Sequence, residues 1–85
     1  MTVSEAKRIV NEFFRDENVS ADEEFVFTEA IKFLIEETKD PDYMNDLGAF
    51  YYGKKQFDLA LRYYELAAEY GNRYAVSNLG YMRDL

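Results

Sequence analysis

Apolar residues recur at helical spacing along almost the whole of this 85-residue chain. No stretch alternates between apolar and polar residues as a half-buried strand does. Two of the clearest helical faces are Ala6, Ile9, Val10 and Phe13, and then Phe27, Ala30, Ile31 and Leu34. The pattern therefore predicts an all-α fold.

Helix start and stop signals divide the chain into five helices joined by short loops. Residues that favour the N-cap position precede four of the stretches, namely Thr2, Ser20, Asp40 and Asn72. Pro41 follows Asp40 and suits the first helical position, where its missing N–H costs nothing. We expect Gly53 and Gly71 to end the third and fourth helices in the left-handed conformation.

The fourth helix, which follows Gln56, is apolar around most of its circumference. Its polar stripe consists of Asp58, Arg62, Glu65 and Glu69, while Phe57, Leu59, Ala60, Tyr63, Tyr64, Leu66, Ala67 and Tyr70 fill the other faces. A helix of this kind requires neighbours on two sides. The sequence therefore predicts that this helix packs between two others.

The chain carries a weak internal repeat of 32 positions. This shift places Phe25 on Phe57, Leu34 on Leu66, and Leu47-Gly48 on Leu79-Gly80. We interpret residues 21–53 and 54–85 as two repeat-like units of one domain spanning 1–85. Residues 1–20 fit the register poorly and are interpreted as a degenerate or capping helix.

The two repeated glycines stand inside expected helices. Glycine in a helix costs about 1 kcal/mol relative to alanine, so its use needs a reason. Because Gly48 and Gly80 both follow a leucine one repeat apart, we expect a close helix–helix approach at each. Replacing either by leucine should then destabilise the fold by more than about 1 kcal/mol through overpacking.

The segment from Ala67 to Met82 resembles a known family. Ala67-Ala68, the helix-ending Gly71, Ala75 and Leu79-Gly80 follow each other as in the Sel-one-like branch of the tetratricopeptide-type helical repeats. The resemblance implies a right-handed α/α superhelix of about two helix–turn–helix repeats. It also implies a protein-interaction module whose first helices line a concave, partner-binding face, here Asn45, Ala49, Tyr52, Tyr74, Ser77 and Tyr81.

Composition narrows the function further. The chain has 17 acidic and 10 basic residues, a net charge of −7, and neither cysteine nor histidine. Acidity disfavours nucleic acid and anionic membranes as partners, since both are bound through Lys and Arg. The usual metal ligands and catalytic bases are missing. We therefore expect no metal, no cofactor and no enzymatic activity, and we expect a cytoplasmic location because no signal-like segment is present.

Two binding hypotheses remain open. In the first, the tyrosine-bearing face binds a basic or amphipathic peptide or protein as an adaptor or regulator. In the second, the chain is a structural unit that forms homo-oligomers through its C-terminal helix, using Leu79, Tyr81, Met82 and Leu85. The acidity is uneven: residues 1–40 carry 11 acidic and 5 basic side chains (net −6), and residues 41–85 carry 6 and 5 (net −1). The nearly neutral second half is therefore the better place for partner contact.

Overall fold

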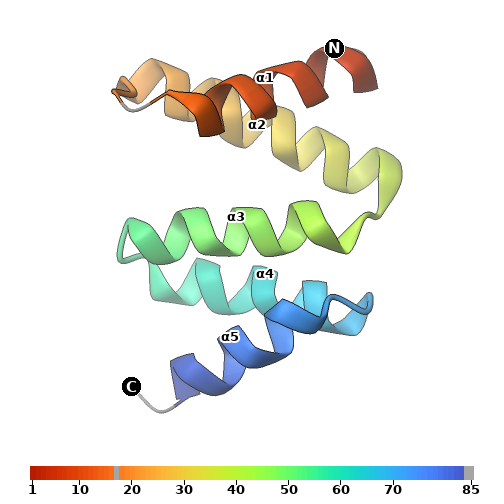
Figure 1. The fold of residues 1–85 in the computed structure, drawn as a ribbon, viewed down its shortest axis with the longest axis vertical. Helices are drawn as coiled ribbons and strands as arrows, with labels where there is room; N and C mark the ends of the chain where they lie inside the picture. The colour runs from red at the N-terminus through yellow and green to blue at the C-terminus, as the bar shows by residue number, and fades with distance from the viewer. Residues whose placement is uncertain (17, 84–85) are drawn as a thin grey trace. The chain divides into compact units, whose positions relative to one another are not determined.

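The computed structural model describes residues 1–16 and 18–83, which contain five α-helices and no strand. The helices are α1 (Val3–Arg15), α2 (Ala21–Thr38), α3 (Pro41–Gly53), α4 (Phe57–Glu69) and α5 (Arg73–Arg83) (Figure 1). The all-α prediction and the number of helices are confirmed. The chain divides into two compact units, Met1–Lys39 and Asp40–Leu85, with the boundary between Lys39 and Asp40.

The four predicted N-caps are confirmed. The Thr2 hydroxyl accepts a hydrogen bond from the backbone N–H of Glu5 at 3.1 Å, and the Ser20 hydroxyl accepts one from Glu23 at 3.2 Å. Side-chain oxygens of Asp40 and Asn72 accept from the N–H groups of Asp42 and Ala75, both at 2.9 Å. Each of these bonds satisfies a donor that the first helical turn leaves unpaired, so the caps fix where four of the helices begin.

The predicted helix ends are only half right. Gly71 takes a left-handed conformation with φ of 100° after α4, as expected. Gly53 does not, because α3 continues through it and the left-handed residue is Lys55, with φ of 61°. The N–H of Gln56 then donates to the Tyr51 carbonyl at 2.9 Å, which satisfies an acceptor of the last turn two residues later than predicted.

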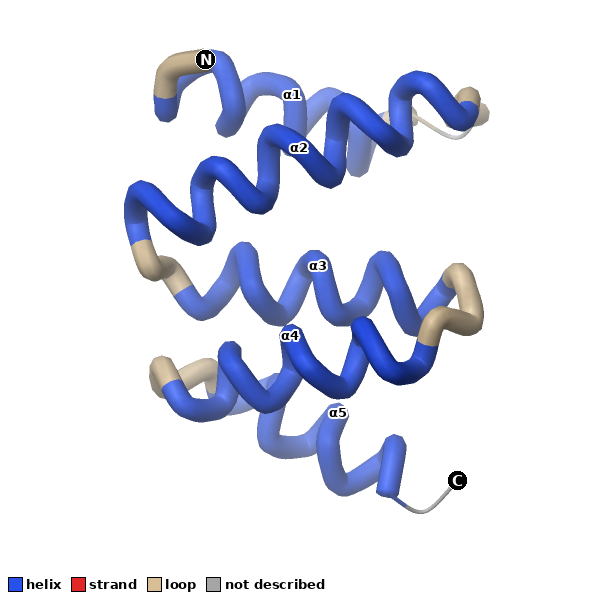
Figure 2. The backbone as a smooth tube through the Cα atoms, turned by 180° about the vertical axis from the view of Figure 1, so that it is seen from behind, coloured by secondary structure: helices blue, strands red, loops and turns tan. Residues whose placement is uncertain are grey.

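Unit Met1–Lys39 is a hairpin of α1 and α2 (Figures 1 and 2). The Phe13 ring of α1 stacks on the Phe27 ring of α2, with centroids 4.0 Å apart and planes 18° apart. Ala6 and Val10 bury the rest of the α1 face. The amphipathic stripe read from the sequence is thus the packing face of α1.

Unit Asp40–Leu85 contains α3, α4 and α5, and α4 packs on both of the others. This confirms the prediction that α4 needs two neighbours, and Figure 2 shows α3 and α4 running side by side. The core of the unit consists of Met44, Leu47, Tyr51, Ala60, Tyr64, Ala67, Ala75 and Leu79.

The two repeated glycines differ in surroundings. A β-carbon on Gly48 would lie 2.7 Å from Cδ1 and 2.8 Å from Cε1 of Tyr64, so α3 and α4 approach as closely as expected there. Gly80 is exposed, and a β-carbon on it would meet nothing within 4 Å. The expectation of close packing at Gly80 is therefore wrong, because no helix among the described residues covers that face of α5 as α4 covers α3.

Candidate functional site: side chains shared by α3 and α5

Two asparagines of the second unit join α5 to α3. Asn78 donates from Nδ2 to Oδ1 of Asn45 at 3.0 Å. Asn72 donates from Nδ2 to Oδ1 of Asp42 at 2.9 Å, while its own Oδ1 caps α5. Asn72 is almost fully buried, and a buried amide needs hydrogen-bond partners within the protein. Both its Nδ2 and its Oδ1 have one. These bonds fix which face of α3 and which face of α5 adjoin.

The C-terminal halves of α3 and α5 enclose a small hollow, which we call the tyrosine pocket. It has a volume of about 190 Å³ and is lined by Tyr52, Tyr64, Asn78, Tyr81 and Met82. The Tyr52 and Tyr81 rings meet edge to face, with centroids 6.3 Å apart and planes 64° apart. The Phe57 ring of α4 also packs against the Tyr52 ring, with ring centroids 5.4 Å apart. The phenol rings therefore form a supported surface.

Two hydroxyl groups of this pocket, those of Tyr52 and Tyr64, have raised pKa values. Desolvation, a side-chain hydrogen bond with Tyr81 and the neighbouring Tyr81 hydroxyl raise the pKa of Tyr52. Desolvation, with a smaller effect of Tyr52, raises the pKa of Tyr64. Neutral phenols act as both donors and acceptors of hydrogen bonds, so the pocket offers polar contacts beside its aromatic area.

An acidic edge, formed by Asp42 and Asp46, lies earlier on α3, about two to three turns before Tyr52. Asp42, Asn45, Ala49 and Tyr52 recur at spacings of three or four residues, with Asp46 beside Asn45. Desolvation, followed by the charges of Asp42 and Asp40, raises the pKa of Asp46. With a rise of 1.5 Å per residue, Asp46 and Tyr52 are separated by about 9 Å along the helix axis. The site thus has a negative end and an aromatic end.

Three of the residues expected on the concave face make contacts between α3 and α5: Asn45 accepts a hydrogen bond from Asn78, and the Tyr52 ring meets the Tyr81 ring. Ala49 is exposed on the same face of α3. Tyr74 and Ser77 are also exposed, Tyr74 by 76%, but neither lines the tyrosine pocket. Of the expected face, the contacts between α3 and α5 thus involve the α3 residues and Tyr81, and they do not involve Tyr74 or Ser77.

Sequence reasoning missed the residues that hold the site together. Asn78 was passed over in favour of Ser77, although the spacing of Tyr74, Asn78 and Tyr81 also marks one face of a helix. Tyr64, interpreted from the sequence only as part of the apolar faces of the fourth helix, both covers Gly48 and lines the tyrosine pocket. The i, i+4, i+7 spacing of Tyr74, Asn78 and Tyr81 could have indicated Asn78 from the sequence. No sequence pattern indicates that Tyr64 has two roles.

Within residues 1–16 and 18–83, His, Cys, Asp and Glu side chains form no group of three that could hold a metal ion. No helix in these ranges is long and apolar enough to span a bilayer. Comparison of the chain with protein-family models, with curated proteins and with solved structures gives no match.

Proposed function

We propose that this chain is a protein-interaction module, not an enzyme, and that it binds a basic or amphipathic peptide segment at the face shared by α3 and α5. The observation that carries the proposal is that Tyr52 of α3 and Tyr81 of α5 contact each other and line the same hollow. Tyrosines that are partly exposed yet fixed by neighbours lose little entropy when they bind. Adaptor or regulatory roles follow from such a surface.

The chemistry of the partner follows from the two ends of the site. Asp42 and Asp46 favour a Lys or Arg, while Tyr52 and Tyr81 favour an apolar or aromatic side chain. The separation of about 9 Å between Asp46 and Tyr52 corresponds to about three residues of an extended peptide or six of a helix. We therefore propose a segment with one basic and one large apolar residue at one of these spacings.

The proposed architecture is a right-handed α/α superhelix of about two tetratricopeptide-type repeats, as in the Sel-one-like branch, within one domain of residues 1–85. Support comes from the shift of 32 positions and from the caps that begin successive helices. In such an array, α3 and α5 are equivalent helices of successive repeats. Their shared face is then the concave face of the module.

The test is selection of random displayed peptides on the purified chain, followed by titration calorimetry of the enriched sequences. We expect enriched peptides to carry the basic and apolar pair, and Tyr52→Ala with Tyr81→Ala to weaken binding by at least about tenfold, as loss of interface hot spots does. Tyr70→Ala is the matched control, since Tyr70 is 47% exposed in the same unit and does not line the tyrosine pocket. Peptides indifferent to the double variant, or equally weakened by the control, would move the binding site elsewhere.

A second candidate function is self-association through α5. Its support is the exposure of Val76 by 60% and Tyr81 by 63%, beside the open surface at Gly80. The surface differs from that expected: Leu79 is only 9% exposed and belongs to the core, and Leu85 lies outside the described residues. Light scattering after size exclusion tests this function, which requires a dimer or larger species that Val76→Glu dissociates.

A further inference from the structure

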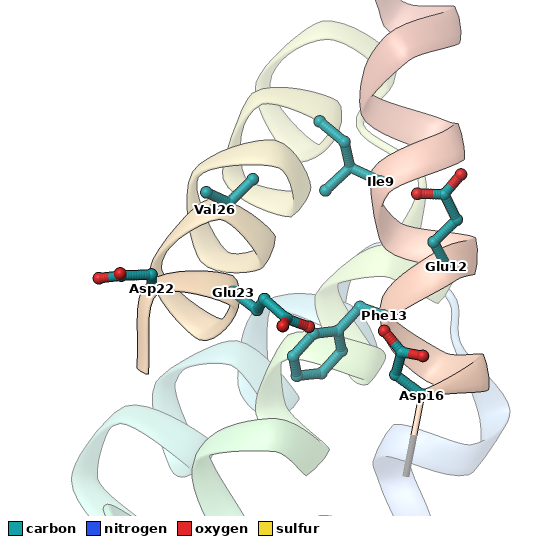
Figure 3. A pocket seen from close by; sticks show the side chains of 7 residues that line it. All are labelled: Ile9, Glu12, Phe13, Asp16, Asp22, Glu23 and Val26. Carbon is teal, nitrogen blue, oxygen red and sulfur yellow. The ribbon is translucent and has the colours of Figure 1, made fainter. Parts of the chain in front are cut away.

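A second, larger hollow lies in the first unit, between α1 and the beginning of α2 (Figure 3). Its volume is about 390 Å³, within the range of about 300–1,000 Å³ typical of ligand pockets. Ile9, Phe13 and Val26 supply its apolar part. We call this hollow the hairpin pocket; it shares no residue with the tyrosine pocket.

The polar part of the hairpin pocket is entirely acidic. Glu12 and Asp16 come from the α1 side, and Asp22 and Glu23 from the first turn of α2. Figure 3 shows Asp16 and Glu23 beside the Phe13 ring, with Glu12 and Asp22 at the outer edges. No Lys or Arg lines the hollow, and across residues 1–16 and 18–83 the structure gives none of these four carboxylates an ion-pair partner.

Helix stability explains only half of this charge. Asp22 and Glu23 lie at the N-terminus of α2, where a negative charge is favoured by the helix dipole. Glu12 and Asp16 lie at the C-terminal end of α1, where the same dipole disfavours a carboxylate. The stability of α1 therefore does not explain these two carboxylates, whereas binding of a positively charged partner group in the adjoining hollow does.

The aromatic wall of the hairpin pocket is held rigidly. Phe27 covers one face of the Phe13 ring at 4.0 Å, and Phe14 meets Phe13 edge-on at 5.9 Å. The part of Phe13 that lines the hollow is thus presented by a fixed ring. An ammonium or guanidinium group is attracted to an aromatic face, and carboxylates on both sides add hydrogen-bond acceptors.

We propose that the hairpin pocket binds a Lys or Arg side chain from a basic amphipathic segment of a partner protein. The aliphatic stem packs on Ile9, Phe13 and Val26, as such stems do at apolar surfaces, and the charged head meets Asp16 and Glu23. Phe14, whose ring contacts that of Phe13, is 55% exposed and provides contact area for the rest of the segment. This site does not depend on the proposed function of α3 and α5.

The test uses a fluorescein-labelled amphipathic helical peptide with arginines along one edge of a leucine face, and an otherwise identical peptide with citrulline in place of arginine. We expect anisotropy titrations to show saturable binding of the arginine peptide that weakens as salt is raised, with at least about tenfold weaker binding of the citrulline peptide. Amide shifts on binding to the wild-type chain should centre on Ile9, Phe13 and Val26.

Matched variants separate the pocket from general acidity. Asp16→Asn with Glu23→Gln should weaken binding at least about tenfold, while Glu36→Gln with Glu37→Gln, an equal charge change on the exposed end of α2, should change it less than twofold. Equal losses in both pairs, binding of the citrulline peptide at full strength, or amide shifts confined to α3 and α5 would overturn the proposal. Absence of saturable arginine-peptide binding at low salt would overturn it as well.

Discussion

The sharpest test of the packing replaces each of the repeated glycines by alanine. Both glycines lie inside helices of the same compact unit, so both changes should gain helix propensity equally, by about 1 kcal/mol. Their surroundings differ: the new β-carbon meets Tyr64 at 2.7 Å in Gly48→Ala and nothing within 4 Å in Gly80→Ala. The difference between the two variants therefore isolates the contact between α3 and α4.

The size of the effect follows from how far Tyr64 can yield. Tyr64 is only 4% exposed, and its Cγ atom is already 3.2 Å from the new carbon. Rotation of the ring about its own axis leaves Cγ in place, so the backbone or the whole side chain has to move. Overpacking of this kind costs about 1–3 kcal/mol. We expect Gly48→Ala to destabilise by about 0–2 kcal/mol after the propensity gain, and Gly80→Ala to stabilise by about 1 kcal/mol.

Urea unfolding of the three proteins, followed by circular dichroism, measures these free energies. The denaturant slope should be unchanged, so that the midpoints report stability alone. The expected gap between the variants is about 1–3 kcal/mol, with Gly48→Ala the less stable. Equal stabilisation by both changes would refute the close approach of α3 and α4, and destabilisation by Gly80→Ala would refute the open face of α5.

Two further predictions concern the polar residues of the second unit. Asn72→Ala removes both the cap of α5 and the bond to Asp42, so urea unfolding should show a loss of about 1–3 kcal/mol, with Asn72→Ser, which keeps a cap oxygen, losing less. The raised pKa of Asp46 means that the folded state holds its proton more tightly than the unfolded state, so this residue lowers stability as pH rises from its ordinary value of 3.8 through the raised value. Asp46→Asn should accordingly be more stable than wild type at pH 7, and this advantage should shrink through that window as pH falls; an advantage that is constant from pH 7 to pH 3 would contradict the assignment.

Local signals in the sequence were enough to place the helices. Thr2, Ser20, Asp40 and Asn72 all cap as expected, because an N-cap depends on a side chain and a backbone group three residues apart or fewer. The apolar circumference of α4 likewise required two neighbours whatever their identity. These features depend on nearest neighbours along the chain or on one helix alone.

Features set by packing between helices were harder to predict. The sequence predicts the left-handed residue at Gly53, but Lys55 takes it. The end of α3 is set by the hydrogen bond from the Gln56 N–H to the Tyr51 carbonyl, which the identity of Gly53 does not reveal. Gly80 carries the same local pattern as Gly48 but lacks a counterpart of Tyr64. The bond of Asn78 to Asn45 depends on the crossing of two helices, which no spacing within one helix determines.

We propose that α3 and α5 together present the partner-binding face of this chain. The most direct measurement is amide chemical-shift mapping of the isotope-labelled chain with a peptide from the selection described above. We expect the largest amide shift changes at Asn45, Tyr52, Asn78 and Tyr81. These shift changes should disappear in the chain that carries both Tyr52→Ala and Tyr81→Ala. Shifts confined to residues 1–39, to the exposed face of α4, or unchanged by the two substitutions would contradict it.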